Sequence, residues 1–151
     1  MTAFRFRLQR LLDVAGAMRL LREAELAQAQ AARRAAEAEV AGAAAGVAAE
    51  ELRHEEAGRG GLSAAEFAWS EMAVAAAGRV LAERVAAALA ADRLVQDRHE
   101  AWLQARQQEQ RYLRLRARAH ARWRQIQSAA AQAELDDLVG AKAARKGGET
   151  A

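Results

Sequence analysis

The sequence predicts an all-α protein that forms a long two-helix antiparallel coiled-coil hairpin with a C-terminal helical overhang. The chain of 151 residues contains 44 alanines and no proline. Alanine is the strongest helix former, and proline is the residue that interrupts helices. Aromatic residues make up only 5% of the chain, whereas strands favour aromatic and β-branched side chains. This composition argues against a β-sandwich, a β-barrel and an α/β enzyme.

The first predicted element is a long helix in residues 1–57, with a helical pattern from about Phe4 to Ala57. Only isolated glycines interrupt this pattern. A helix of about 54 residues would be about 80 Å long at a rise of 1.5 Å per residue. Because helices of this length exceed those of globular bundles, we expect it to pair with another helix along its length.

A glycine-rich turn is predicted at residues 58–63, where Gly58, Gly60 and Gly61 interrupt the helical pattern. Ser63 and Glu66 have the spacing of a capping box. In that motif the serine side chain accepts from the backbone N–H three residues later, and the glutamate side chain reaches back to the serine N–H. The second helix is therefore predicted to begin at residue 64.

The second predicted helix occupies residues 64–139 and would be about 114 Å long. Gly140 is a plausible cap for its C-terminus. The polar segment 140–151 is expected to be disordered. The second helix is thus about 20 residues longer than the first, which leaves the predicted overhang.

A coiled-coil seam is indicated by large apolar residues that recur every seven positions. If the chain reverses at Gly60 and Gly61, residues whose numbers add to about 121 should face each other. The predicted seam residues are Leu8, Leu26, Val40, Val47, Val74, Leu81, Val95 and Trp102. Most layers between them are alanines, which bury little area, so the hairpin is expected to be only modestly stable on its own.

Composition and charge further limit the possible functions of the protein. The chain has no cysteine, which excludes disulfides and thiolate catalysis. No apolar run is long enough to cross a membrane, and no signal peptide is evident, so we expect a soluble, unprocessed chain. The three histidines have no metal-binding spacing, and a two-helix rod offers no enclosed pocket. We therefore predict a protein that is not an enzyme and that uses no cofactor.

One segment of the second helix is strongly basic. No acid occurs from Gln110 to Ala133, and six arginines do. These arginines, together with an aromatic and an aliphatic residue of the overhang, form the predicted partner-binding site: Arg111, Arg114, Arg116, Arg118, Arg122, Trp123, Arg124 and Ile126. Trp123 and Ile126 are expected to have no partner within the chain, as are Leu135 and Leu138. The basic run is either a solvated face or a site for an acidic partner, which from charge alone could be a protein ring, a nucleic acid or an anionic lipid.

A second cluster follows the predicted turn and comprises Phe67, Trp69 and Met72. Phe67 continues the seven-residue repeat of the seam. Trp69 lies two residues later, so on a helix it should face elsewhere, and it is a candidate contact for a partner.

The two ends of the chain resemble those of the flagellar export protein FliJ family. Residues Phe4 to Asp13 read FRFRLQRLLD and are similar to the N-terminal FxFRLQxLLD signature of that family. The basic run ending at Trp123, followed by QAELDDL at residues 132–138, is similar to the family's C-terminal basic helix and its QxELDE stretch. The resemblance covers about 45 residues, and the alanine-rich centre matches only in character.

The resemblance implies a cytoplasmic component of the flagellar type III export apparatus, similar in shape to the γ-subunit stalk of rotary F-type ATPases. Such a stalk enters and helps to assemble the hexameric export ATPase, contacts the export-gate protein FlhA and binds export chaperones. It associates with the inner face of the membrane only through the apparatus, and binding of nucleic acid is not implied. Two alternatives stay open: the equivalent stalk of a virulence type III secretion system, and a basic coiled coil that binds nucleic acid.

Overall fold

A computed structural model describes residues 3–148, with side chains described for residues 3–142. The chain folds into two helices, α1 (Gln9–Arg59) and α2 (Ala64–Gly148), and the described residues contain no strand. The all-α helical hairpin is thereby confirmed. By contact density the chain divides into two units, which are described separately: unit 1 contains residues 1–18 and 105–151, and unit 2 contains residues 19–104.

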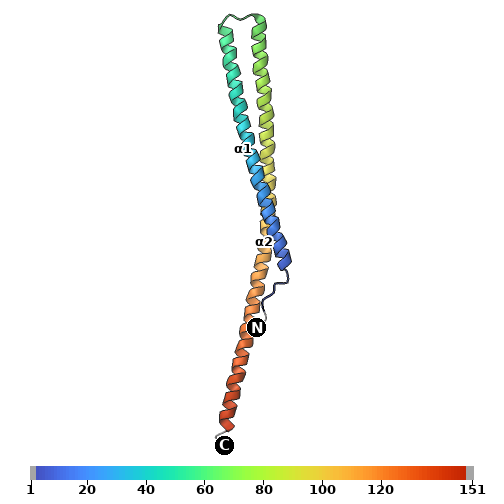
Figure 1. Cartoon of the computed structure of the whole chain (residues 1–151), viewed down its shortest axis with the longest axis vertical. Helices are drawn as coiled ribbons and strands as arrows, with labels where there is room; N and C mark the ends of the chain where they lie inside the picture. The colour runs from blue at the N-terminus through green and yellow to red at the C-terminus, as the bar shows by residue number, and fades with distance from the viewer. Residues whose placement is uncertain (1–2, 149–151) are drawn as a thin grey trace. The chain divides into compact units, whose positions relative to one another are not determined.

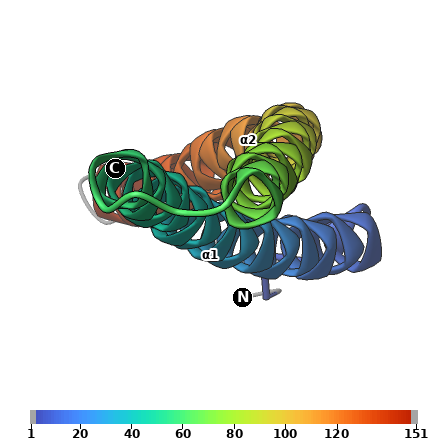
Figure 2. The same cartoon turned by 90° about the horizontal axis from the view of Figure 1, so that it is seen from above.

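In unit 2 the two helices run antiparallel and are joined by a short turn (Figures 1 and 2). Buried and half-buried residues of α1 recur at alternating spacings of three and four, which is the heptad pattern of a coiled coil. On α2, Val74, Leu81, Ala88, Val95 and Trp102 are half-buried at intervals of seven. The packing surface of each helix is therefore the narrow stripe that the sequence repeat indicates.

The turn is built by one glycine and one capping box. Gly61 has a φ of 72°, a left-handed conformation that side chains other than glycine rarely adopt. The backbone N–H of Glu66 donates to the Ser63 hydroxyl at 3.3 Å, and the Ser63 N–H donates to the Glu66 carboxylate at 2.9 Å. The predicted capping box is confirmed. The Ser63 hydroxyl also donates to the Glu66 carboxylate at 2.7 Å, and this bond, the larger cause, together with the bond from the Ser63 N–H lowers the pKa of Glu66, because both favour its ionised form.

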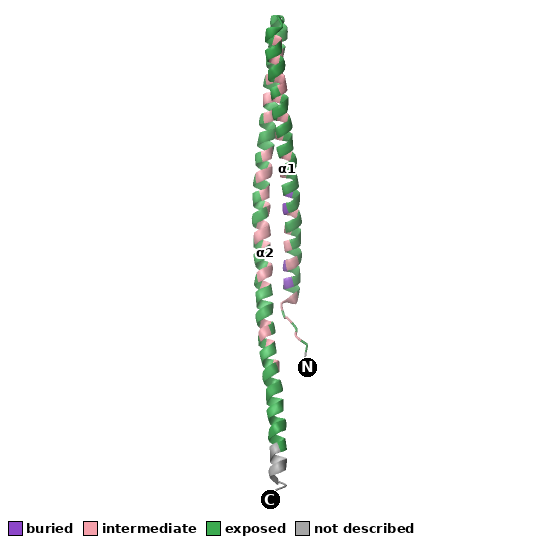
Figure 3. Ribbon diagram, turned by 90° about the vertical axis from the view of Figure 1, so that its left-hand side faces the viewer, coloured by how far each residue is buried: buried purple, intermediate pink, exposed green. Residues whose placement is uncertain are grey.

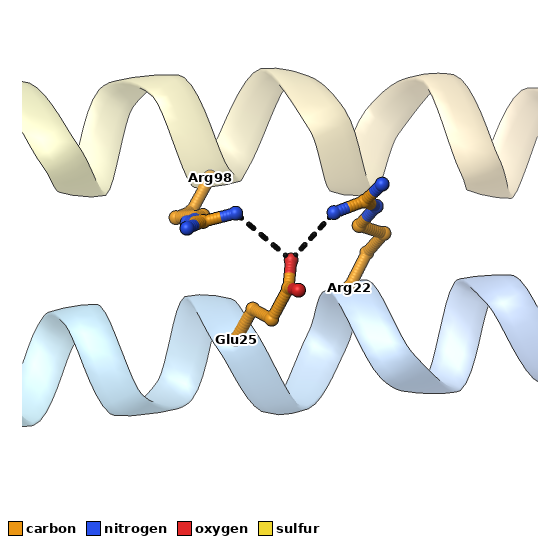
Figure 4. A network of polar contacts seen from close by, with 3 residues as sticks. All are labelled: Arg22, Glu25 and Arg98. Carbon is orange, nitrogen blue, oxygen red and sulfur yellow. Dashed lines mark hydrogen bonds and ion pairs between the residues drawn. The ribbon is translucent and has the colours of Figure 1, made fainter.

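Polar pairs cross the seam of unit 2. Glu25 of α1 accepts hydrogen bonds from Arg22 at 2.8 Å and from Arg98 of α2 at 3.1 Å (Figure 4). The hydrogen bond from Arg22, the larger cause, and the nearby Arg98 hold the pKa of Glu25 below its usual value. Arg33 likewise pairs with Asp92 at 3.4 Å. A third cross-helix ion pair joins Arg84 to Glu39 at 3.7 Å. In all three pairs the residue numbers add to slightly more than the predicted 121, so the register is close to the predicted one.

The packed core is small in both units. Among the described residues only Leu12 and Ala15 of unit 1 and Leu26 and Ala29 of unit 2 are buried. All four lie on α1, as Figure 3 shows by their colour. At about 25 cal/mol per Å² of apolar area removed from water, such small and partly exposed side chains contribute little, which agrees with the modest stability expected from the alanine content.

The helix boundaries correct three expectations. The first helix begins at Gln9 rather than near Phe4, because residues 3–8 form a non-helical segment. It ends at Arg59 rather than Ala57. The second helix does not end at Val139 but continues to Gly148, since Gly140 does not take the left-handed conformation of a helix cap. Of the predicted disordered tail, residues 140–148 are therefore helical, and residues 149–151 lie outside the described part.

Candidate protein-binding site

The basic surface of unit 1 is formed by two segments of the chain. Six of its arginines lie on α2 and three come from residues 5–10, and all are exposed: Arg5, Arg7, Arg10, Arg111, Arg114, Arg116, Arg118, Arg122 and Arg124. Within residues 3–142, no ion pair joins any of these nine to an acid. By contrast, several arginines of unit 2 have an acidic partner, as in the pairs of Arg33 and Arg98. Unit 1 therefore presents uncompensated positive charge.

A groove of about 610 Å³ opens between the two segments that carry these arginines. Its lining combines four arginines with apolar residues such as Leu8, Leu115 and Ala119. Residues that line it are Arg5, Phe6, Arg7, Leu8, Leu115, Arg118, Ala119 and Arg122. A groove of this chemistry suits carboxylates next to an apolar side chain. The rule that facing residue numbers add to about 121 predicts Arg5 and Arg7 beside the first part of the basic run, but the sequence analysis missed Phe6 and the groove, although the alternation of arginine with apolar residues at positions 4–8 was a signal for them.

Trp123 does have a partner within the chain, and the expectation that it lacks one is wrong. Its ring stacks on His120 with centroids 5.7 Å apart and lies 5.9 Å from the ring of Phe4. Phe4 also meets His120 edge to face at 4.9 Å. The non-helical segment before α1 reaches along α2 and covers part of Trp123, which is half-buried as a result.

Beyond Trp123, α2 is almost entirely exposed. Ile126 is 65% exposed, and every residue from Ser128 to Lys142 is exposed. Leu135 and Leu138 are therefore open to solvent, as the predicted overhang requires. The green colour of this part of α2 in Figure 3 shows the same feature.

The cluster after the turn divides into a packed residue and two free ones. Phe67 lies against the ring of His54 with centroids 4.6 Å apart. Trp69 and Met72 are 77% and 70% exposed. Because a tryptophan is seldom so exposed without a function, Trp69 is a candidate contact for a partner.

His54 has a structural part in unit 2. The Ser70 hydroxyl donates to the carbonyl oxygen of Phe67 at 2.7 Å, so its oxygen is left to accept from Nδ1 of His54, also at 2.7 Å. The signal for this contact was the position of His54 seven residues after Val47, on the seam itself.

Seven of the eight predicted seam residues lie on the two helices, where Leu26 is buried and the other six are half-buried. The eighth, Leu8, is half-buried but belongs to the non-helical segment before α1 and lines the groove, so its assignment to a helical seam is wrong. No group of three or more potential metal ligands occurs among the described residues, and no described helix is apolar enough to span a membrane.

These features define a class: an all-α helical-hairpin protein with exposed basic and apolar surfaces. The sequence profile described as "Flagellar FliJ protein" matches residues 4–148, which is nearly the whole chain. The chain belongs to the FliJ family, whose members serve flagellar protein export and are not known as enzymes. Comparisons with curated proteins and with solved structures give no match.

Proposed function

We propose that this protein is the central stalk of a flagellar type III export ATPase, and that unit 1 is the part that enters the ring. The observation that carries this proposal is the set of nine exposed arginines without an acidic partner, in a chain of the FliJ family. Uncompensated charge of one sign attracts a surface of the opposite sign from a distance and raises the rate of association. The partner is therefore a hexameric ring with an acidic inner surface.

Within this site the arginines and the apolar residues have separate tasks. The six arginines of the site that lie on α2 steer the encounter between this protein and the ring. They are Arg111, Arg114, Arg116, Arg118, Arg122 and Arg124. Ile126, exposed on the same helix, is an anchor that becomes buried in the complex. Trp123 acts both as an anchor through its exposed edge and as the support on which Phe4 and His120 are placed.

The remaining partners are assigned to the surface after the turn. We assign contact with the export-gate protein FlhA and with export chaperones to Trp69 and Met72, with Phe67 holding the local structure. The protein then resides at the inner face of the cell membrane through these partners. The exposure of Trp69 supports the assignment, and the family membership supplies the identity of the partners.

The test is the kinetics of binding to the purified export ATPase. Reversal of three arginines (Arg114→Glu, Arg118→Glu and Arg122→Glu) should slow association and make the remaining binding less sensitive to salt. The matched control reverses three exposed arginines of unit 2 that form no ion pair with any residue of the described range 3–142: Arg34→Glu, Arg79→Glu and Arg93→Glu. Trp123→Ala should mainly speed dissociation, at a cost of about 2 kcal/mol if its ring is buried in the complex.

A second measurement addresses assembly of the ring. The protein should raise ATP hydrolysis by the ATPase most strongly at low ATPase concentration, because a stalk that binds only the closed ring favours assembly by mass action. Stimulation that is constant across dilution would contradict this. If Trp69→Ala abolishes ring binding and the arginine reversal does not, unit 2 is the part that enters the ring. Binding to generic duplex DNA that is tight and falls steeply with salt would favour the nucleic-acid alternative instead.

A further inference from the structure

In the C-terminal part of α2, one face of the helix is basic near residue 118 and acidic near residue 136. On an α-helix, residues spaced by three and four share a face. Six exposed residues between positions 118 and 136 have this spacing: Arg118, Arg122, Ile126, Ala129, Ala133 and Asp136. The face therefore runs from basic, through apolar and small, to acidic, and Asp137 adds a second carboxylate at the acidic end.

We propose that this face pairs with the same face of a second copy of the chain, with the two α2 helices antiparallel. A two-fold axis between Gln127 and Ser128 sets Arg118 of each copy opposite the carboxylates of Asp136 and Asp137 in the other. The same register sets Ile126 opposite Ala129.

The complementarity holds only for the antiparallel arrangement. In a parallel pair Arg118 and Arg122 would face their own copies, and like charges at short distance repel. In the antiparallel pair the small side chains of Ala129 and Ala133 let the helices approach closely, so that Ile126, 65% exposed in the single chain, becomes covered. The aliphatic stem of Arg122 lies over Ala133.

The second copy also supplies a packing partner for the C-terminal part of α2, which has none in the single chain. Every residue from Ser128 to Lys142 is exposed in the single chain, and isolated helical segments of this length are marginal in water. Pairing along about 20 residues of one helix buries less than the roughly 1,600 Å² of a standard stable interface. The dimer is consequently weak, with dissociation in the micromolar range.

The dimer does not depend on the proposed role in an ATPase ring, but it uses two of the same side chains. Arg118 and Arg122 cannot contact an acidic ring and a second copy at once. Self-association therefore competes with ring binding and is displaced when the ring binds more tightly.

The test is analytical ultracentrifugation of the full chain alone, without the ATPase. The unchanged protein should show a monomer–dimer equilibrium over micromolar concentrations. Two variants, one with Arg118→Glu and Arg122→Glu and one with Asp136→Arg and Asp137→Arg, should each be monomeric, because each places like charges opposite one another. An equimolar mixture of the two should regain the dimer, since each reversed end then meets its opposite. The control variant with Arg79→Glu and Arg93→Glu should dimerise as the unchanged protein does.

Cysteine crosslinking tests the direction, since the chain has no natural cysteine. On oxidation, a mixture of an Ile126→Cys chain and an Ala129→Cys chain should crosslink faster than either chain alone. A protein that is monomeric at all these concentrations overturns the proposal, as does a mixture of the charge variants that stays monomeric. Faster self-crosslinking of the Ile126→Cys chain also overturns it, because that result indicates a parallel pair.

Discussion

Phe4 meets His120 edge to face, with ring centroids 4.9 Å apart, although 115 positions separate them in the sequence. Both rings also lie within 6 Å of Trp123 by the same measure, at 5.9 and 5.7 Å. This three-ring cluster fixes the non-helical segment of unit 1 on α2. The cluster therefore determines where Arg5 and Arg7 stand relative to Arg118 and Arg122 in the groove.

Replacing Phe4 by alanine should release the segment before α1. The loss of two aromatic contacts is expected to cost about 1–2 kcal/mol locally. In protein labelled with 5-fluorotryptophan, the ¹⁹F resonance of Trp123 should shift. The fluorine nucleus should also become more accessible to a paramagnetic relaxation agent in solution. The resonances of Trp69 and Trp102, which belong to unit 2, serve as internal controls and should stay in place. An unchanged Trp123 resonance would contradict the packing of the segment.

Two glycine substitutions should have opposite effects on stability. Gly61→Ala should destabilise the protein by about 1 kcal/mol, because its φ of 72° is strained for alanine. Gly42→Ala should stabilise it by about 0.5–1 kcal/mol, since an added Cβ meets nothing within 4 Å in the middle of α1. Urea unfolding followed by circular dichroism measures both. A Gly61→Ala variant as stable as the unchanged protein would show that the turn does not require glycine at position 61.

Loss of the capping box should weaken the start of α2. Ser63→Ala removes the acceptor for the Glu66 N–H and is expected to cost about 1 kcal/mol. Ser128→Ala is the matched control, because the Ser128 hydroxyl only donates back to the Gln125 carbonyl within the helix. Urea midpoints compare the two variants, and the control should be unchanged or more stable, since alanine is the better helix former.

The Glu25 network should make unit 2 sensitive to acid. Because Arg22 and Arg98 lower the pKa of Glu25, its contribution to stability is present above the unfolded-state pKa and is lost as the pH falls through the lower folded-state pKa. Glu25→Gln should therefore lower the melting temperature at neutral pH and have a smaller effect in acid. The control is Glu51→Gln, an exposed glutamate of α1 that forms no ion pair or side-chain hydrogen bond with the residues whose side chains the structure describes. A loss that is the same at both pH values would indicate packing rather than charge.

Oxidation of a cysteine pair should report the hairpin directly. His54→Cys and Ser70→Cys replace side chains whose polar atoms are 2.7 Å apart across the two helices, so they should form an intramolecular disulfide. His54→Cys with Trp69→Cys is the control, because Trp69 is 77% exposed and points away from the seam. Non-reducing electrophoresis distinguishes the monomeric product from a crosslinked dimer, and dimer alone from the first pair would contradict the hairpin.

Local signals were sufficient for most of the fold. The heptad repeat identified the seam, and the glycines and Ser63 located the turn, because both patterns act over a few residues. The non-helical segment at residues 3–8 was missed, since its conformation depends on contacts with His120 and Trp123, more than 100 positions away. The end of α2 was missed because Gly140 is followed by alanines and by no proline, so the helix continues.

The positive charge of the candidate site was predictable from the sequence, but the groove within it was not. Six arginines without an acid are visible in the sequence of α2. That Arg5, Phe6 and Arg7 complete a groove with Arg118 and Arg122 follows only from the path of the chain before α1. The partial burial of Trp123 also depends on the path of the chain before α1. The segment that contains Phe4 covers part of the Trp123 side chain, which α2 alone would leave exposed.

The alanine layers of unit 2 make the alignment of its helices depend on very few side chains. Ala29, Ala36 and Ala43 repeat every seven residues along the seam of α1, so sliding α2 by one heptad would exchange one alanine layer for another with little change in packed volume. The pairs Glu25–Arg98 and Arg33–Asp92 do not repeat in this way, and each would lose its partner in a slipped pairing. Together with the pair Glu39–Arg84 and the contact between His54 and Ser70, these ion pairs fix the alignment of the two helices, and without them little besides the turn would hold it.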